Sequence, residues 1–194
     1  MALQKIIEHK QLTYLFTGLG KNILSFNTIV KQRNLITIDY AYCLKNRVMM
    51  PNEIYTLRRA TIDDASACAL IVDGWIEKTV EMPRLLNKHK LTEIIRNAIP
   101  LREVWVIGQP INGYISYNPD LLQISALYVN KKGEGIGKIL LDRIKSDLKY
   151  LHLWSHEFNN STHKFYKREG FQLKNGKDHG SDGIPELQFE WIGK

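Results

Sequence analysis

The pattern of apolar and polar residues along the chain changes near residue 50. Before the segment Val48-Met49-Met50-Pro51-Asn52, short mixed apolar stretches show neither a helical nor an alternating period over the length of a domain. After this segment, β-type and helical patterns follow one another in regular succession. The sequence therefore predicts an N-terminal extension over residues 1–50 and one folded domain over residues 51–194. Translation from Met49 or Met50, which would omit the extension, remains an alternative.

Strands and helices are predicted throughout the folded domain. Apolar and β-branched runs predict strands at 54–59, 103–107, 111–117, 121–129, 151–155, 171–173 and 187–191. Helical periodicity with start and stop signals predicts helices at about 63–75, 88–98, 135–150 and 160–169. The turn residues Gly108-Gln109-Pro110 predict a hairpin between two of the strands. This order predicts a mixed α/β domain with hairpins in the middle and helix crossovers late in the chain.

Composition adds the class of protein. The 194 residues are 44% hydrophobic and 24% charged, as in an ordinary globular protein. The sequence has no window of about 18 or more apolar residues, so no transmembrane helix is predicted. The apolar runs near the N-terminus are short, and no small-residue cleavage site follows them. A cytoplasmic location is therefore expected.

The positive charge is concentrated in the extension. The net charge is +7, yet residues 1–50 carry seven of the 27 basic side chains and two of the 20 acidic ones. The domain itself is nearly balanced, which disfavours nucleic acid as its partner. Cys43 and Cys68 belong to no C-x-x-C motif and no Cys/His pair, so we expect neither a disulfide framework nor a metal site.

A glycine-rich loop separates the predicted strand 121–129 from the helix that follows it. Gly133, Gly135 and Gly137 permit positive φ and close approach of the backbone, so several N–H groups can converge on one anion. The helix adds the positive end of its dipole. The predicted buried stripe of this helix consists of Ile136, Leu140, Ile144 and Leu148. The lysines that supply countercharge are Lys131, Lys132 and Lys138. This combination predicts a phosphate-binding loop.

Two common phosphate-binding patterns do not fit this loop. A Walker loop, G-x-x-x-x-G-K-[ST], fails because Ile139 follows Gly137-Lys138 and because Lys132 occupies the first glycine position. A dinucleotide fingerprint beginning at Gly133 would place its last glycine at position 138, which is lysine. A different phosphate ligand is therefore expected.

The loop and a second motif together resemble the GNAT superfamily of N-acetyltransferases. The superfamily's coenzyme A loop, [QR]-x-x-G-x-[GA], is matched from Lys132 to Gly137, with lysine in place of Arg or Gln. Lysine keeps the positive charge but loses planar, bidentate geometry. The superfamily's N-x-x-[small]-x-x-[FL]-Y-x-x-x-G-F pattern is matched by Asn159, Thr162, Phe165, Tyr166, Gly170 and Phe171. The interval between the motifs has room for the one helix and one strand that the superfamily places there.

The resemblance implies a fold, a co-substrate and a set of site residues. The implied fold is a mixed, mostly antiparallel, twisted sheet flanked by helices on both faces. The implied activity is direct attack of a primary amine on acetyl-CoA in a ternary complex, without a metal. Tyr166 would protonate the departing thiolate, since a phenol with a pKa near 10 suits a leaving thiol. The residues that the resemblance assigns to coenzyme A are Leu127, Tyr128, Val129, Lys132, Gly133, Glu134, Gly135, Ile136, Gly137, Lys138 and Asn159.

Two of these assignments carry alternatives. In the superfamily the strand before the loop splays from its neighbour, and the N–H of Leu127 or Tyr128 would polarise the thioester carbonyl. Asn159 would bind the pantetheine arm. A helix N-cap is the other reading of Asn159, although Asn160 or Ser161 could fill that position.

The acceptor side has weaker signals. The strand 121–127 lacks the glutamate that many GNAT enzymes use as a base, so the base is unassigned. Candidates are Ser125 acting through water, or His156 and Glu157. A narrower resemblance to bacterial GNAT proteins of unknown substrate rests on Trp75, Met82-Pro83, Leu153-Trp154 and Pro185-Glu186 with the later Trp191. It implies that Trp75, Met82 and Glu186 line the acceptor pocket, with core packing as the alternative for the first two.

The predicted function is acetyl transfer from acetyl-CoA to a small primary amine. Alternatives are acetylation of a protein N-terminus, a lysine or a charged tRNA, a coenzyme A sensor without turnover, and a nucleic-acid-binding module on residues 1–50. A homodimer also stays open. The sequence leaves the acceptor and the acyl length unidentified.

Overall fold

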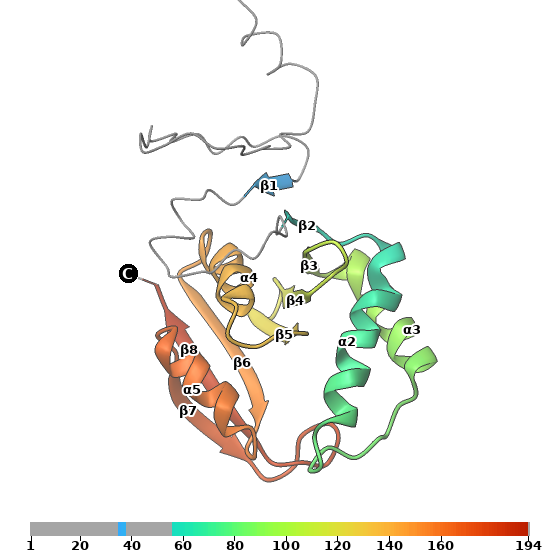
Figure 1. Ribbon diagram of the computed structural model, residues 1–194. Coiled ribbons are helices and arrows are strands. Elements are labelled where there is room, and N and C mark those ends of the chain that lie inside the picture. The colour runs from blue at the N-terminus through green and yellow to red at the C-terminus, as the bar shows by residue number, and fades with distance from the viewer. Residues whose placement is uncertain (1–34, 38–55, 194) are drawn as a thin grey trace, which may run out of the picture.

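One twisted sheet forms the centre of the molecule (Figure 1). The computed structural model describes residues 35–37 and 56–193, so most of the predicted extension, with Cys43, lies outside the described residues. The strand order is β1-β2-β3-β4-β5-β6-β8-β7. The strands are β1 (Leu35–Thr37), β2 (Thr56–Arg59), β3 (Glu103–Ile107), β4 (Gly113–Asn118), β5 (Gln123–Val129), β6 (Tyr150–His156), β7 (Gln172–Lys177) and β8 (Glu186–Ile192). All neighbouring pairs in this described sheet are antiparallel except β5 and β6, which are parallel.

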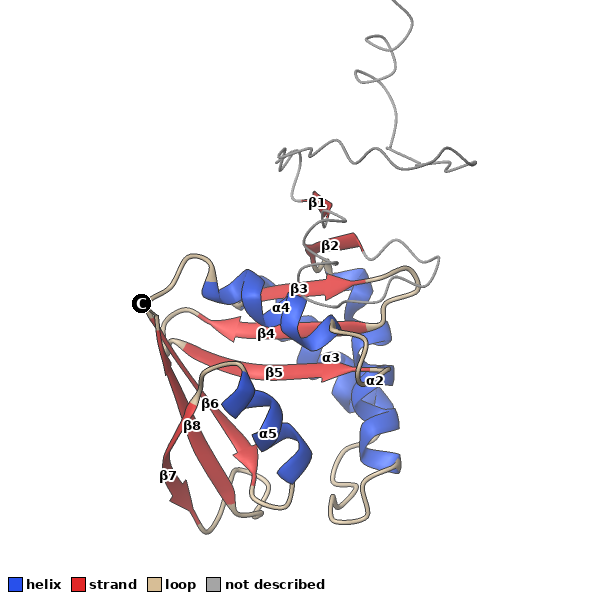
Figure 2. Cartoon of the chain, turned by 60° about the vertical axis from the view of Figure 1, so that its left-hand side comes forward, coloured by secondary structure: helices blue, strands red, loops and turns tan. Residues whose placement is uncertain are grey.

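Helices cover both faces of the sheet. Their bounds are α2 (Ala65–Glu77), preceded by a 3₁₀ turn at Ile62–Asp64, α3 (Lys88–Ala98), α4 (Ile136–Lys145) and α5 (Asn160–Arg168). Figure 2 shows α4 in front of β3 to β5, with α2 and α3 behind them. Strand β3 is buried from both sides, because Val104 and Val106 join the core under α2 and α3, whereas Trp105 and Ile107 join the core under α4 and α5. The predicted mixed, mostly antiparallel sheet with helices on both faces is confirmed.

Several predicted boundaries move in the structure. The helix predicted at 135–150 ends at Lys145, although Leu148 still packs against the same core. The strand predicted at 171–173 extends to Lys177, because it pairs with β8 along that length. The helix predicted at 88–98 keeps these bounds as α3, and a 3₁₀ turn at Ile99–Leu101 follows it. Among the described residues, no helix is long and apolar enough to cross a membrane.

Strands β5 and β6 separate after their first residues. They pair only where Gln123 faces His152 and Ile124 faces Leu153, and beyond that point the two strands diverge (Figure 2). Ser125 is an extra residue in β5, since Ser116 and Tyr117 of β4 face residues 126 and 124. Such a bulge bends a strand and increases its twist. The sheet is therefore opened into a wedge between β5 and β6.

Candidate active site

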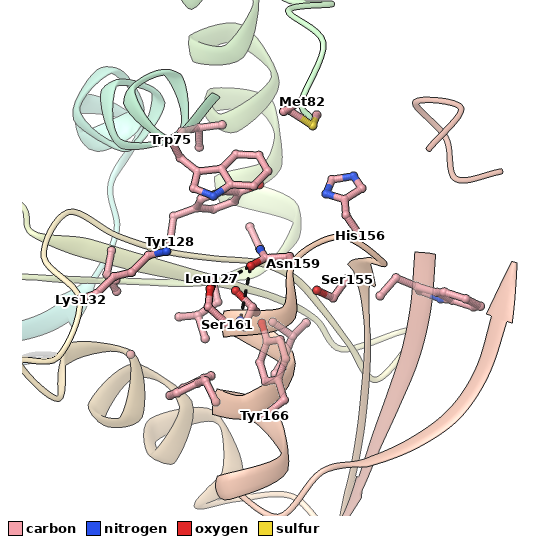
Figure 3. A pocket seen from close by; sticks show the side chains of 18 of the residues that line it. Trp75, Met82, Leu127, Tyr128, Lys132, Ser155, His156, Asn159, Ser161 and Tyr166 are labelled. Atoms are coloured by element: carbon pink, nitrogen blue, oxygen red, sulfur yellow. Dashed lines mark hydrogen bonds between the residues drawn. The ribbon is translucent and has the colours of Figure 1, made fainter. Parts of the chain in front are cut away.

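The wedge between β5 and β6 holds a cavity of about 830 Å³. Its wall combines β5, the glycine-rich loop, the start of α4, the end of β6 and α5 with side chains from α2 and from the loops at 82–86 and 181–186. Pockets that bind drug-sized ligands have volumes of about 300–1,000 Å³. Figure 3 shows Lys132 at one end of the cavity, His156 at the other, and Leu127, Asn159 and Tyr166 between them.

The structure brings the residues of both sequence motifs to this one cavity. The predicted site residues that line it are Leu127, Tyr128, Val129, Lys132, Gly133, Gly135, Ile136, Gly137, Lys138, Asn159 and Tyr166. Glu134 is the predicted residue that does not line it, and its carboxylate lies 4.0 Å from the Lys131 ammonium instead. The two motifs are thus parts of one site.

The glycine-rich loop has the backbone geometry of an anion site. Gly133 and Gly135 have φ of 86° and 78°, in the left-handed region that disfavours side chains with a Cβ. Gly135 is the N-cap of α4, and the Ile139 amide donates to the Gly135 carbonyl at 3.1 Å. The amides of residues 136–138 precede that bond, so the helix itself offers them no partner. They are donors available to an anion at the positive end of the helix dipole.

The lysines of the loop contribute unequally. The Lys138 ammonium lies 2.7 Å from the carboxylate of Asp142 and 3.7 Å from that of Glu169, so its charge is largely offset. Lys131 and Lys132 are exposed and line the rim of the cavity. Lys131 also lies 4.0 Å from the Glu134 carboxylate. The expected countercharge therefore comes mainly from Lys132, and the backbone amides form the body of the loop site.

The side chain of Tyr166 comes from α5 and is 5% exposed. Its ring packs against Phe165, Phe171 and Phe189, with centroids 5.3, 5.5 and 6.0 Å away. Burial raises the pKa of Tyr166 well above the ordinary value of a phenol. The phenol is therefore neutral at physiological pH and can donate a proton.

Asn159 is the N-cap of α5, so the alternative positions Asn160 and Ser161 do not fill that role. Its side-chain oxygen accepts from the Thr162 amide at 3.4 Å and from the Ser161 hydroxyl at 3.2 Å. The side-chain NH₂ of an asparagine carries two further donors. Capping therefore uses the oxygen and leaves the NH₂ group of this cavity-lining residue available to a ligand.

The backbone of β5 distinguishes Leu127 from Tyr128. The Asn130 amide donates to the Asn112 carbonyl at 2.8 Å, on the side of β4. Amides alternate in direction along a strand. The Tyr128 amide therefore points toward β4, and the Leu127 amide points toward the opened edge facing β6. Of the two amides proposed as oxyanion donors, the geometry favours Leu127.

The far end of the cavity contains a histidine held by an aspartate. His156 ends β6, and its Nε2 lies 2.7 Å from Oδ2 of Asp182. The imidazole is stacked on Trp75 at a centroid distance of 6.1 Å and on Phe158 at 5.3 Å. Glu186 lies close by, with its Oε1 4.0 Å from the same Nε2.

The structure also sorts the predicted acceptor residues. Trp75, Met82 and Glu186 line the cavity, and Trp75 and Met82 also pack against the core under α2 and α3, so both readings of these two residues hold. Trp191 packs against the other core cluster and does not line the cavity. Ser125 and His156 line the cavity, whereas Glu157 does not. Sequence reasoning missed Asp182, because it lies 26 positions from His156 in a glycine-containing turn with no linear link to that strand.

Cys68 is buried in α2, and burial raises the pKa of its thiol to about 12. It is therefore a protonated core residue outside the cavity wall. Among residues 35–37 and 56–193, no group of three or more His, Cys, Asp and Glu side chains is arranged to hold a metal ion.

Similarity to known proteins is detected through structure. No protein-family model matches the sequence, and no curated protein gives a significant match. A GNAT-family acetyltransferase from Bacillus cereus matches with a TM-score of 0.58 and 19% identity, over 72% of this chain and 98% of that one. The ribosomal-protein-alanine N-acetyltransferase of Brucella melitensis matches with a TM-score of 0.57 and 21% identity, over 70% and 98% of the two chains. The putative acetyltransferase yncA of Salmonella typhimurium, solved with acetyl-CoA, matches with a TM-score of 0.56 and 16% identity, over 72% and 94%. The chain therefore has the fold of the GNAT acetyltransferases.

Proposed function

We propose that the protein transfers an acetyl group from acetyl-CoA to a small primary amine. The observation that carries this proposal is the single cavity that joins the glycine-rich loop at the start of α4 to Tyr166 and the opened edge of β5. Acetyl-CoA needs an anion site for its pyrophosphate, an unpaired strand edge for its pantetheine arm and a proton donor for the departing thiolate. The structural relatives solved with acetyl-CoA or coenzyme A support the same assignment.

The chain's own residues supply defined steps. The loop amides and Lys132 bind the pyrophosphate, and the NH₂ group of Asn159 and the edge of β5 hold the pantetheine arm. The Leu127 amide stabilises negative charge on the thioester oxygen as the amine attacks. The new C–N bond forms, the C–S bond breaks, and the sulfur takes a proton from Tyr166. Holding both reactants in one cavity supplies part of the rate by proximity.

A small amine is favoured as the acceptor because side chains from two separate loops help to line the cavity. Leu85 and Leu86 come from the loop before α3, and Ser181 and Asp182 come from the loop between β7 and β8. A primary amine on a compact carbon skeleton suits such a wall, which combines apolar and acidic groups. A protein N-terminus, represented by a short peptide, is the competing acceptor in the test.

The first measurement is acetyl-CoA binding by calorimetry, with a matched pair of glycine variants. Gly135→Ala and Gly170→Ala both place a Cβ on a left-handed residue, with φ of 78° and 86°, but Gly170 ends α5 outside the cavity wall. Each substitution strains the backbone by about 1–2 kcal/mol. We expect Gly135→Ala to weaken acetyl-CoA binding roughly 5–30-fold, because relieving about 1–2 kcal/mol of strain turns the loop amides away from the anion. Gly170→Ala should bind like the wild type. Equal affinities for the three proteins would contradict the loop assignment.

The second measurement is release of coenzyme A thiol with a panel of acceptors. The panel contains spermidine, benzylamine, L-lysine and a short peptide with an N-terminal alanine. We expect steady thiol release with at least one small amine and a product heavier by one acetyl group in mass spectrometry. Turnover with the peptide alone would select a macromolecular acceptor. Tight binding of acetyl-CoA without release for any acceptor would indicate a sensor.

A further inference from the structure

We propose that His156 is the base that takes the proton of the acceptor amine, and that Asp182 is the residue that positions it. This inference rests on the proposed acetyl transfer, for which a base is required because an attacking amine becomes positively charged as the C–N bond forms. His156 occupies the end of the cavity opposite Lys132, with Tyr166 between the two (Figure 3). The amine would thus enter between Tyr166, which protonates the departing thiolate, and the imidazole of His156.

The bond from His156 to Asp182 sets which nitrogen can act. In a neutral imidazole one nitrogen donates and the other accepts. Nε2 lies 2.7 Å from a carboxylate oxygen of Asp182, which accepts only, so Nε2 carries the hydrogen. Burial opposes ionisation of Asp182, but hydrogen bonds from His156 and from the Ile184 amide outweigh it and lower the pKa of this carboxyl. Nδ1 is therefore left with a lone pair.

The turn between β7 and β8 fixes the carboxylate of Asp182. Its second oxygen, Oδ1, accepts from the Ile184 amide at 3.1 Å. The turn is closed by the Gly180 amide, which donates to the Ile184 carbonyl at 2.7 Å, and by Gly183 at a φ of 82°. Both oxygens thus have assigned partners, one on His156 and one on the backbone. A carboxylate held in this way orients an imidazole and stabilises the imidazolium that proton transfer produces.

Aromatic neighbours favour the same protonated product. The imidazole is nearly parallel to the rings of Trp75 and Phe158, with interplanar angles of 11° and 4°. A cation over an aromatic face is stabilised by the ring quadrupole. The stacking also restricts rotation of the imidazole. A base needs this restriction because its lone pair must stay directed at the amine proton.

The other charged and titratable groups around His156 are paired, neutral or exposed. Glu186 Oε1 is 4.0 Å from Nε2, although Lys177 Nζ pairs with the other oxygen of Glu186 at 2.7 Å. Tyr128, which contacts Trp75 edge-on, is neutral because burial raises its pKa to about 12. His163 bonds to the His156 carbonyl, and Glu157, the next residue in the chain, is exposed.

The other candidates suit the role less well. Glu157 does not line the cavity. Ser125 does, but a serine hydroxyl is a poor base without a partner that takes its own proton. His156 combines a free nitrogen lone pair with a fixed carboxylate.

The proton balance of the full step closes with these residues. The nitrogen lone pair of the neutral amine forms the C–N bond, and the electron pair of the C–S bond leaves on sulfur. The amine proton passes to Nδ1 of His156, while Tyr166 protonates the sulfur. Tyr166 is then reprotonated and His156 deprotonated through solvent, so the net reaction is amine plus acetyl-CoA to amide plus coenzyme A.

The test compares His156→Gln and Asp182→Asn with His152→Gln in the full chain. His152 lies on the same strand but outside the cavity wall, so its variant controls for loss of a strand histidine. Thiol release is measured against pH with the most active amine of the panel and with trifluoroethylamine, whose low basicity keeps the nucleophile neutral. Acetyl-CoA affinity is measured for every variant.

We expect His156→Gln to lower kcat by about 10²–10⁴, the usual contribution of a general base, with unchanged acetyl-CoA affinity. The acidic limb of the wild-type pH profile, expected between about pH 5 and 8 for a histidine, should disappear in this variant. In Asp182→Asn, that limb should move to lower pH, because loss of the carboxylate destabilises the imidazolium. His152→Gln should keep both rate and limb. His156→Gly, rescued by added imidazole, tests the same role without a replacement side chain.

Two results would overturn the inference, and they differ from each other. Wild-type turnover that persists in His156→Gln with the same acidic limb would remove His156 as the base and leave the proposed function standing. Absence of thiol release by the wild type with every acceptor would overturn the proposed function, and the assignment of His156 with it.

Discussion

Replacing Tyr166 with phenylalanine tests the proton donor while leaving its surroundings in place. The ring of Tyr166 is 5% exposed and packs against Phe165, Phe171 and Phe189. Phenylalanine keeps these ring contacts and removes only the hydroxyl. We therefore expect the free energy of unfolding to change by less than about 1 kcal/mol. Tyr166→Ala, in contrast, should lose about 3–5 kcal/mol, because it leaves a cavity in the core.

The effect of Tyr166→Phe on catalysis should be much larger than its effect on stability. Loss of a general acid lowers a rate by about 10²–10⁴, which corresponds to roughly 3–5 kcal/mol in the barrier. The decrease should appear in kcat, with the acetyl-CoA affinity unchanged within about twofold.

The pH dependence gives a second check on Tyr166. A general acid works while it is protonated, and burial raises the pKa of this phenol above its ordinary value of 10.0. The wild-type rate should therefore show no alkaline decline from this group below about pH 10.

Thiol release under saturating acetyl-CoA and urea unfolding measure these effects separately. A Tyr166→Phe variant that folds normally and keeps kcat within threefold of the wild type, on the order of 0.6 kcal/mol, would refute the donor role. Loss of activity together with loss of the folded state would instead indicate a structural role.

Three further predictions concern binding and stability. Lys132→Ala should raise the Kd for acetyl-CoA by less than about fivefold, because Lys132 is exposed and exposed ion pairs contribute about 0–1 kcal/mol. The difference in Kd should shrink in high salt. A larger loss of affinity that does not depend on salt, measured by calorimetry, would contradict a role at the rim of the cavity. Asp64→Asn should destabilise the protein by about 1–3 kcal/mol at pH 7, because it breaks a bidentate pair with Arg58 at 2.6 and 2.7 Å. That pair holds the pKa of Asp64 below its ordinary value, so the wild-type advantage in urea titrations is present above about pH 4 and is lost as the pH falls through the lowered pKa. Gly74→Ala should stabilise α2 by about 0.5–1 kcal/mol, because an added Cβ meets no atom within 4 Å; a lower melting temperature would count against this.

Much of the fold was predictable because it follows from local patterns. Apolar and β-branched runs located the central strands, and glycines located the end of α5 and the loop before α4. The boundaries that moved depend on partners distant in sequence. The length of β7, for example, is set by its pairing with β8, and no local signal in residues 174–177 indicates it.

The site divides in the same way. Both motifs were visible in the sequence because loop glycines and a helix start carry a local signature. The choice of Leu127 over Tyr128 as the oxyanion donor was not visible in the sequence, because it depends on which amide of β5 is left unpaired by β4. Asn159 illustrates a third case. Its role as a helix N-cap depends on neighbouring residues in the sequence, whereas its position on the cavity wall depends on the tertiary structure.

The sequence by itself thus determined the order of elements and the glycine-rich loop, because hydrophobic period and backbone freedom are properties of neighbouring residues. Tertiary structure decided which residues share the cavity. It opened β5 from β6 at the Ser125 bulge and carried the turn with Asp182 across 26 positions to His156. The physical reason is that strand divergence and side-chain pairing depend on distances through space, which the spacing of residues along the chain does not fix.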